Sequence, residues 1–174
     1  MSLEIIYGLK MWKKINIQSE ILYKQCLKKN IFVTTAESCT GGMLASSIVS
    51  VSGSSNIFKS SIITYSNEMK SLILKIPSKI IEINGAVSEI VAKKMAVNVL
   101  TLLKADVAIS VTGIAGPGGG SEEKPVGLVW MAIATSKSVV VQKNFFDGNR
   151  LEIRQKTTLE ALKLANKTIK KLNS

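Results

Sequence analysis

The sequence predicts an α/β fold, a three-layer α/β/α sandwich around a mixed β-sheet. Amphipathic stretches with helical spacing alternate with short apolar stretches of strand length, which is typical of a sheet covered by helices on both faces. Two strand-like stretches also follow each other across a short polar turn, which predicts an antiparallel hairpin within the sheet. The 174 residues, 46% of them hydrophobic, suffice for one domain with a buried core.

Five helices are expected. In the first of them Ile17, Ile21 and Leu22 recur at helical spacing and form one apolar face. Ser88 stands near the start of the fourth, where a serine side chain can cap the first turn. The expected helices are Ile15–Asn30, Met43–Val51, Asn67–Leu74, Gly85–Lys104 and Asn149–Leu172.

Five strands, rich in apolar and β-branched residues, are expected between these helices. In open α/β sheets, ligands collect at the carboxyl ends of the strands. Three segments of unusual composition, Glu37–Gly42, Tyr65–Lys70 and Thr112–Gly120, fall at such strand ends, and their convergence predicts an active site there. The expected strands are Ile31–Ala36, Ser61–Tyr65, Asp106–Thr112, Val126–Thr135 and Val139–Phe145.

Composition excludes several classes of site. The sequence contains no histidine, so a histidine base and a histidine-ligated metal are both excluded. Two cysteines, Cys26 and Cys39, cannot build a disulfide framework, and their spacing fits no zinc motif. No apolar run approaches the roughly 20 residues that span a bilayer, and the N-terminus offers no clean signal-peptide core. We therefore expect no membrane association and a cytoplasmic location.

The net charge of +11 permits two interpretations. One is a partner rich in phosphate. The other, which we favour, is a general abundance of lysine, isoleucine and asparagine, because the lysines are scattered over the predicted helices rather than gathered into one arm.

The first unusual segment places Ser38 at a strand-to-helix turn, directly before Cys39, Thr40, Gly41 and Gly42. Such a turn can present the serine hydroxyl beside backbone N–H groups that hold an oxyanion or an anionic ligand. Alternatively, Ser38 or Thr40 only caps the following helix. Cys39 is a rival nucleophile, but consecutive residues at this turn point in different directions and cannot both face a substrate.

Without histidine, Lys70 is the best candidate base for the serine, provided that burial lowers its pKa. A neutral amine can accept the serine proton and later return a proton to a leaving group. The alternative is an ordinary surface lysine. Tyr65 could place its hydroxyl in the site or at the core edge. The glycine-rich segment Gly113–Gly120 either surrounds a phosphate with backbone amides or serves as a flexible connection.

Six segments, in order and with their spacing, resemble the CinA C-terminal domain family, from about Gln18 to the C-terminus. Most specific are the segment around Ser38 and the Tyr65–Lys70 segment. The six are Thr35–Gly42, Gly53–Ser55, Thr64–Lys70, Asn84–Ser88, Val111–Gly119 and Glu123–Gly127.

The resemblance implies a nicotinamide-nucleotide amidase, which hydrolyses nicotinamide mononucleotide to nicotinic acid mononucleotide and ammonia, without metal or organic cofactor. It implies Ser38 as the nucleophile and Lys70 as the catalytic lysine, with Tyr65, Ser55 and Thr112 as supporting polar residues. The turn Thr40, Gly41 and Gly42 is expected to bind the substrate and its oxyanion. From charge and glycine content we expect the ribose phosphate to meet Gly113, Gly116, Gly118, Gly119 and Arg150, or Arg154 nearby.

Residues 1–14 fall outside the resemblance, so we divide the chain into an N-terminal extension, 1–14, and an amidase-like domain, 15–174. Many family members carry a further N-terminal domain, and a stand-alone form is expected here. A homodimer is expected because closed two-fold dimers are the commonest oligomers.

Two other functions stay open. One is a non-catalytic binding or regulatory protein. A lysine stripe on the last helix, at Lys163, Lys167, Lys170 and Lys171, could bind nucleic acid, but the low aromatic content argues against that partner. The other is an amidase for another small amide.

Overall fold

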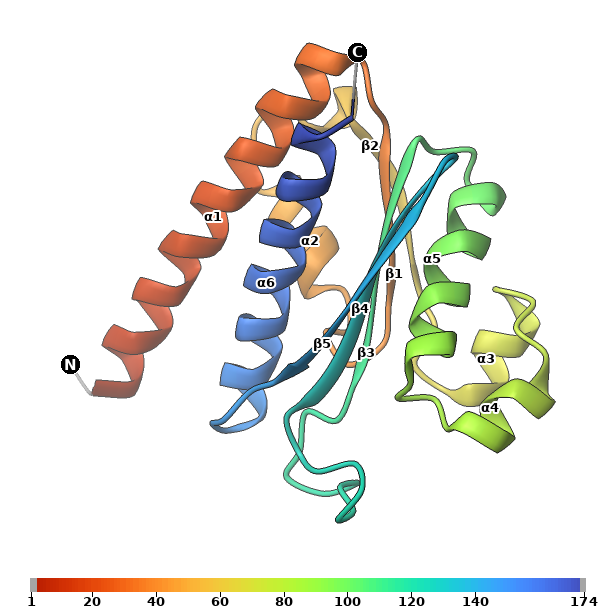
Figure 1. Ribbon diagram of the computed structural model, residues 1–174. Helices are drawn as coiled ribbons and strands as arrows, with labels where there is room; N and C mark the ends of the chain where they lie inside the picture. Colours follow the sequence, from red (N-terminus) through yellow and green to blue (C-terminus); the bar gives the residue numbers. More distant parts are fainter. Residues whose placement is uncertain (1–2, 173–174) are drawn as a thin grey trace.

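One five-stranded mixed sheet, with helices on both faces, forms the centre of the computed structural model (Figure 1). The structure describes residues 3–172, with side chains described from residue 8 onward. This arrangement confirms the predicted fold class. The strands are β1 (Val33–Glu37), β2 (Phe58–Ile63), β3 (Val107–Gly113), β4 (Leu128–Thr135) and β5 (Val139–Phe145).

The strand order β2-β1-β3-β4-β5 places three parallel strands side by side. β1 pairs in parallel with β2 and with β3, whereas β4 and β5 form the predicted antiparallel hairpin that continues the sheet from β3. At the carboxyl end of β1, Glu37 lies opposite Ile63 of β2 and Val111 of β3. The loops after these three strands therefore leave the sheet at one edge, as the sequence predicts.

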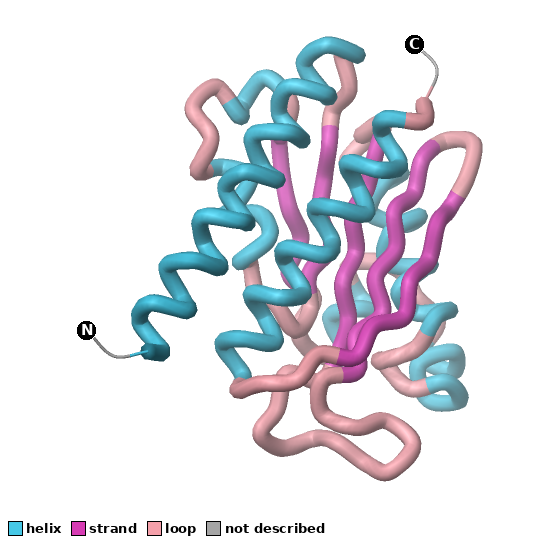
Figure 2. The backbone as a smooth tube through the Cα atoms, turned by 60° about the vertical axis from the view of Figure 1, so that its left-hand side comes forward, coloured by secondary structure: helices cyan, strands magenta, loops and turns pink. Residues whose placement is uncertain are grey.

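Helices divide between the two faces of the sheet, as Figures 1 and 2 show. α1, α2 and α6 cover one face, and α5 covers the other, with α3 and α4 beside its N-terminal end. In β3, Ile109 belongs to the core under α6 and its neighbour Ala108 to the core under α5, which is the two-residue alternation of a strand buried on both faces. The helices are α1 (Leu3–Lys29), α2 (Met43–Val49), α3 (Asn67–Leu72), α4 (Ser78–Asn84), α5 (Glu89–Leu102) and α6 (Arg150–Lys170), with a 3-10 turn, η1 (Ser54–Asn56), before β2.

α1 begins earlier than predicted. It runs from Leu3 to Lys29 as one continuous helix, through the boundary expected at residue 15. Met11 and Ile15 are both buried, and Trp12 packs against the same core. The helix therefore extends into the segment taken as an extension because that segment already contributes to the core.

Other elements differ from the prediction by several residues at their ends, and one element is new. β2 begins at Phe58 and not at Ser61, and α4 was not expected at all. α5 begins at Glu89, so Ser88 does occupy the N-cap position. Its hydroxyl, however, donates to the carbonyl of Gly85 (2.9 Å) and does not cap the helix.

Within residues 3–172, no helix is both long enough and apolar enough to cross a membrane.

Two leucines of α1 test which face of this helix packs on the protein. Leu22 is 0% exposed, whereas Leu27 is 51% exposed. We expect Leu22→Ala to lower the free energy of unfolding by about 2–5 kcal/mol, because it removes buried methyl groups and leaves a cavity. Leu27→Ala should change it by less than about 0.5 kcal/mol. Urea denaturation of both variants measures the difference, and equal effects would contradict the packing described.

Candidate active site

The loops that leave the sheet at the carboxyl ends of β1, β2 and β3 enclose a cleft of about 230 Å³. The three segments singled out at strand ends all contribute to it, and so do the link between α4 and α5, which belongs to the family-like segment Asn84–Ser88, and Arg150 at the start of α6. The lining residues are Ser38, Cys39, Tyr65, Asn67, Lys70, Ala86, Val87, Thr112, Gly113, Ala115 and Arg150.

Ser38 and Lys70 are in direct contact in this cleft. The Nζ atom of Lys70 lies 3.0 Å from the Oγ atom of Ser38. It also contacts two backbone carbonyls, those of Thr64 (2.8 Å) and Tyr65 (3.3 Å). The Ser38 N–H donates to the carbonyl of Val111 on β3 (3.0 Å), which ties the serine backbone to the sheet.

The Lys70 side chain is 1% exposed, and no carboxylate lines the cleft. Burial lowers the pKa of Lys70 to about 8, because the charged ammonium loses its hydration. A neutral amine has two N–H bonds and one lone pair. Because the two carbonyls can take both N–H bonds, the lone pair is left for the hydroxyl proton of Ser38. The arrangement can therefore activate the serine.

Cys39 is poorly suited to be the nucleophile. Burial raises the pKa of its thiol to about 12, so the reactive thiolate is scarce at neutral pH. Its side chain is only 5% exposed and belongs to the core under α6.

The backbone amides of the glycine turn are already engaged. Gly41 and Gly42 have φ values of 58° and 93°, which glycine adopts without strain, and this turn connects β1 to α2. The N–H of Gly42 donates to the Glu37 carboxylate (2.9 Å), and that of Gly41 donates to the Ser38 carbonyl (3.1 Å). The Thr40 hydroxyl also donates to Glu37 (2.7 Å). The Thr40 hydroxyl and the N–H groups of Gly41 and Gly42 therefore already have acceptors within the protein, whereas the sequence suggested that they face a substrate.

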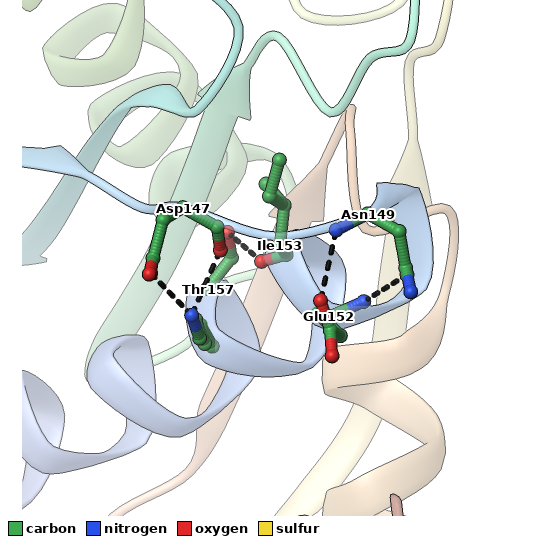
Figure 3. Close-up of polar contacts among 6 residues, drawn as sticks. Asp147, Asn149, Glu152, Ile153 and Thr157 are labelled. Carbon is green, nitrogen blue, oxygen red and sulfur yellow. Dashed lines mark hydrogen bonds and ion pairs between the residues drawn. The ribbon is translucent and has the colours of Figure 1, made fainter. Parts of the chain in front are cut away.

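The start of α6 brings two arginines to the site. Asn149 caps this helix and accepts from the N–H groups of Leu151 (3.0 Å) and Glu152 (3.1 Å), while the Glu152 carboxylate accepts from the Asn149 N–H (2.9 Å; Figure 3). This capping box fixes where the helix begins. Arg150 and Arg154, one turn apart, consequently lie above the loops that carry the serine and the tyrosine.

Arg150 joins two of these loops. It donates to the Gly116 carbonyl and to the Tyr65 hydroxyl, both at 2.7 Å. Arg154 donates twice to the Thr40 carbonyl, from Nε (3.2 Å) and Nη2 (2.7 Å). Neither guanidinium forms an ion pair with any side chain that the structure describes.

Of the other predicted site residues, some lie at the cleft and others lie outside it. Tyr65 is 59% exposed at the cleft mouth, and the Thr112 hydroxyl in the cleft donates to the Ala86 carbonyl (2.9 Å). Gly113 lines the cleft and Gly116 holds Arg150, but Gly118 and Gly119 are exposed and outside the lining.

Ser55 is not in the cleft. It lies in η1 before β2, and Phe58 at the start of β2 pairs with Val33 at the start of β1. Ser38 instead follows the end of β1. The parallel pairing therefore places Ser55 at the opposite end of the sheet, and we leave it out of the proposed catalytic group.

The structure places four residues near the serine to which the sequence analysis assigned no role: Glu37, Asn67, Ala86 and Val87. Asn67 precedes Lys70 by three residues on α3, which places both on one helix face. That spacing could have identified Asn67 from the sequence. In the described part of the chain, no group of three or more cysteine, aspartate or glutamate side chains could hold a metal ion.

Comparisons with known proteins agree on one family. The model of the CinA C-terminal domain matches residues 16–169. A CinA-like protein of Prochlorococcus marinus subsp. pastoris is 48% identical over 140 residues, 79% of this chain and 32% of that protein. The chain spans about a third of the length of the curated relatives it matches.

Solved structures of similar length share the fold. The competence/damage inducible protein CihA from Agrobacterium tumefaciens is 37% identical with a TM-score of 0.85, covering 87% of this chain and 93% of that one. A CinA superfamily protein from Klebsiella pneumoniae is 27% identical with a TM-score of 0.88, covering 91% and 99% respectively.

The lowered pKa of Lys70 predicts a pH-dependent stability. Between about pH 8 and the ordinary value of 10.5, the unfolded chain keeps the lysine proton that the folded chain has lost. Because the unfolded state binds more protons, stability rises with pH across this window. Urea unfolding at several pH values should show that Lys70→Met abolishes this contribution, whereas Lys167→Met, an exposed matched control on α6, keeps it. Parallel curves for wild type and Lys70→Met would refute the perturbed amine.

Proposed function

Because this chain belongs to the CinA C-terminal domain family, we propose that it is a nicotinamide-nucleotide amidase that converts nicotinamide mononucleotide and water to nicotinic acid mononucleotide and ammonia. The observation that carries the proposal is the 3.0 Å contact between the Lys70 amine and the Ser38 hydroxyl in the cleft. This pair supplies a nucleophile and a base without histidine. The substrate is taken from the family resemblance of the Ser38 and Lys70 segments.

Acylation begins on the neutral form of Lys70. The Ser38 Oγ attacks the carboxamide carbon while its proton passes to the Lys70 Nζ, and a tetrahedral intermediate forms. The Lys70 ammonium then donates a proton to the amide nitrogen, the C–N bond breaks and ammonia leaves. This step leaves a nicotinoyl ester on Ser38 and a neutral Lys70.

Deacylation repeats the same proton transfers with water. Lys70 takes a proton from the water that attacks the ester carbon, and it returns a proton to the Ser38 Oγ as the C–O bond to the serine breaks. The product acid gives up its remaining proton to solvent and leaves as a carboxylate, and the enzyme regains its starting state.

The oxyanion of each tetrahedral intermediate needs donors that no protein acceptor already holds. Among the described residues, no acceptor of another residue takes the N–H of Cys39 or Thr40, the two residues that follow the nucleophile, and the Cys39 N–H contacts only its own sulfur. A backbone N–H directly after the nucleophile is a common oxyanion donor in hydrolases. We assign the oxyanion to these two groups, in place of the Gly41–Gly42 turn expected from the sequence.

The dimensions of the cleft suit the reacting part of the substrate. Its volume of about 230 Å³ lies below the roughly 300–1,000 Å³ of pockets that enclose a whole drug-sized ligand. The pyridine ring and its carboxamide would occupy it, and the phosphoribosyl group would extend past the mouth. Arg150 stands there without an ion-pair partner among the described side chains, and planar guanidinium groups bind phosphate well.

Three single substitutions test the nucleophile and the base. In assays of ammonia release from nicotinamide mononucleotide, we expect Ser38→Ala and Lys70→Ala to lower kcat by at least about 10³-fold, because each removes a group that acts in every step. Cys39→Ala should stay within about threefold of wild type. Loss of activity in Cys39→Ala with an active Ser38→Ala would reverse the assignment, and no release by the folded wild type would exclude this substrate.

The role of Arg150 is tested by a comparison of two substrates. Arg150→Gln should raise KM for nicotinamide mononucleotide by about 10–100-fold, the range of one charge-assisted hydrogen bond. It should leave KM for nicotinamide riboside, which has no phosphate, nearly unchanged. Steady-state kinetics with both substrates decide the matter, since equal effects on the two would exclude a phosphate contact.

A further inference from the structure

Glu37 is a buried carboxylate with an unusual set of partners. It directly precedes Ser38 and is 0% exposed. Five hydrogen bonds reach it, and all five come from donors of the protein. Its Oε2 accepts from the Thr40 hydroxyl (2.7 Å) and from the N–H groups of Gly42 (2.9 Å) and Leu44 (3.1 Å). Its Oε1 accepts from the Ala45 N–H (2.7 Å) and the Thr35 hydroxyl (3.3 Å).

This contact set needs a carboxylate and not an amide. A glutamine side chain would present an NH₂ group to partners that are themselves donors, whereas both oxygens of a carboxylate only accept. No lysine or arginine forms an ion pair with Glu37 among the described residues. The N–H groups at the start of α2 instead supply the positive end of a dipole that balances a negative charge.

The same contacts fix the loop that carries the nucleophile. Glu37 is the last residue of β1, and its partners Thr40 and Gly42 come after Ser38 in the sequence. The chain from Glu37 to Gly42 is therefore closed into a loop by the Glu37 side chain. Arg154 holds the same loop from α6 through the Thr40 carbonyl.

Glu37 also determines which backbone donors remain available. It takes the N–H groups of Gly42, Leu44 and Ala45, while those of Cys39 and Thr40 have no acceptor on any other described residue. On the basis of the proposed function, we infer that Glu37 is a positioning residue for catalysis. Its carboxylate, which only accepts hydrogen bonds, holds Ser38 against Lys70 and directs the N–H groups at the start of α2 away from the cleft. The N–H groups of the two residues after the serine are thereby left for the oxyanion.

The test uses Glu37→Gln, which keeps the size of the side chain and changes one acceptor into a donor. Its control is Asp106→Asn, the same carboxylate-to-amide change at an exposed residue, whose carboxylate accepts from the N–H of Phe32 (2.8 Å), the residue before the start of β1. Circular dichroism and thermal melting first establish that each variant is folded at the assay temperature. Two readouts follow: kcat and KM for ammonia release, and the rate at which an alkyl fluorophosphonate labels Ser38, located by mass spectrometry.

We expect Glu37→Gln to lower both kcat and the labelling rate by at least about 10-fold with KM within about threefold, because small displacements of reacting groups cost up to about 10²-fold. Asp106→Asn should retain both rates within about twofold. A folded Glu37→Gln that keeps full kcat and full labelling overturns the inference, since a purely structural cap would leave both unchanged. If Glu37→Gln does not fold, Thr40→Val, compared with Thr40→Ser, decides in the same way: loss in the valine variant with rescue by serine supports it, and equal rates overturn it.

The labelling readout separates this inference from the proposed substrate. Wild type that is labelled at Ser38 but releases no ammonia would exclude nicotinamide mononucleotide, and the labelling rates of the variants would still decide the role of Glu37. Wild type that is not labelled at Ser38 would overturn the nucleophile assignment, and the positioning role with it.

Discussion

A lysine amine with no counter-ion among the side chains that the structure describes is the constraint on which the site depends. Every contact of the Lys70 Nζ is to an uncharged oxygen, and two of them are backbone carbonyls at the end of β2. The short turn between β2, which ends at Ile63, and α3, which begins at Asn67, supplies both carbonyls, and α3 supplies the lysine itself. The parallel neighbour β1 then brings the serine to the same edge. The sheet topology, the short α3 and the absence of acids from the cleft lining all serve this one amine.

Sequence reasoning succeeded where periodicity and strand order determine the result. The alternation of helical and strand patterns predicted the layers, and the rule for strand ends predicted that the segments around Ser38, Lys70 and Thr112 meet. It failed where the result depends on which hydrogen-bond partner each polar group has in the folded protein. Glycines at 41 and 42 indicated available amides, but no pattern shows that Glu37, five residues before Gly42, accepts one of them. Ser55 was included from its motif alone, and only the pairing of β1 with β2 reveals its distance from the site.

Two helices show how packing overrides local signals. The segment that forms α4 contains Ile80, Ile81 and Ile83, β-branched residues that disfavour a helix, yet Ile81 is buried in the core under α5. The first turns of α1 carry several lysines and offer little periodic contrast, but Met11 and Ile15 pack on the protein. In both cases the helix is stabilised by burial of a few apolar side chains against another element. The sequence alone does not show which element that is.

The missing counter-ion at Lys70 also bears on how a turnover would end. The proposed reaction makes a carboxylate in a cleft whose lining offers no acidic group to repel it. A protonated Lys70 would attract that carboxylate and retain it, whereas the neutral amine would not. Product inhibition would then be strongest below about pH 8, where the amine carries its proton. The lowered pKa of Lys70, which activates the serine, would thus also determine how readily the product carboxylate leaves. One side chain would govern both steps.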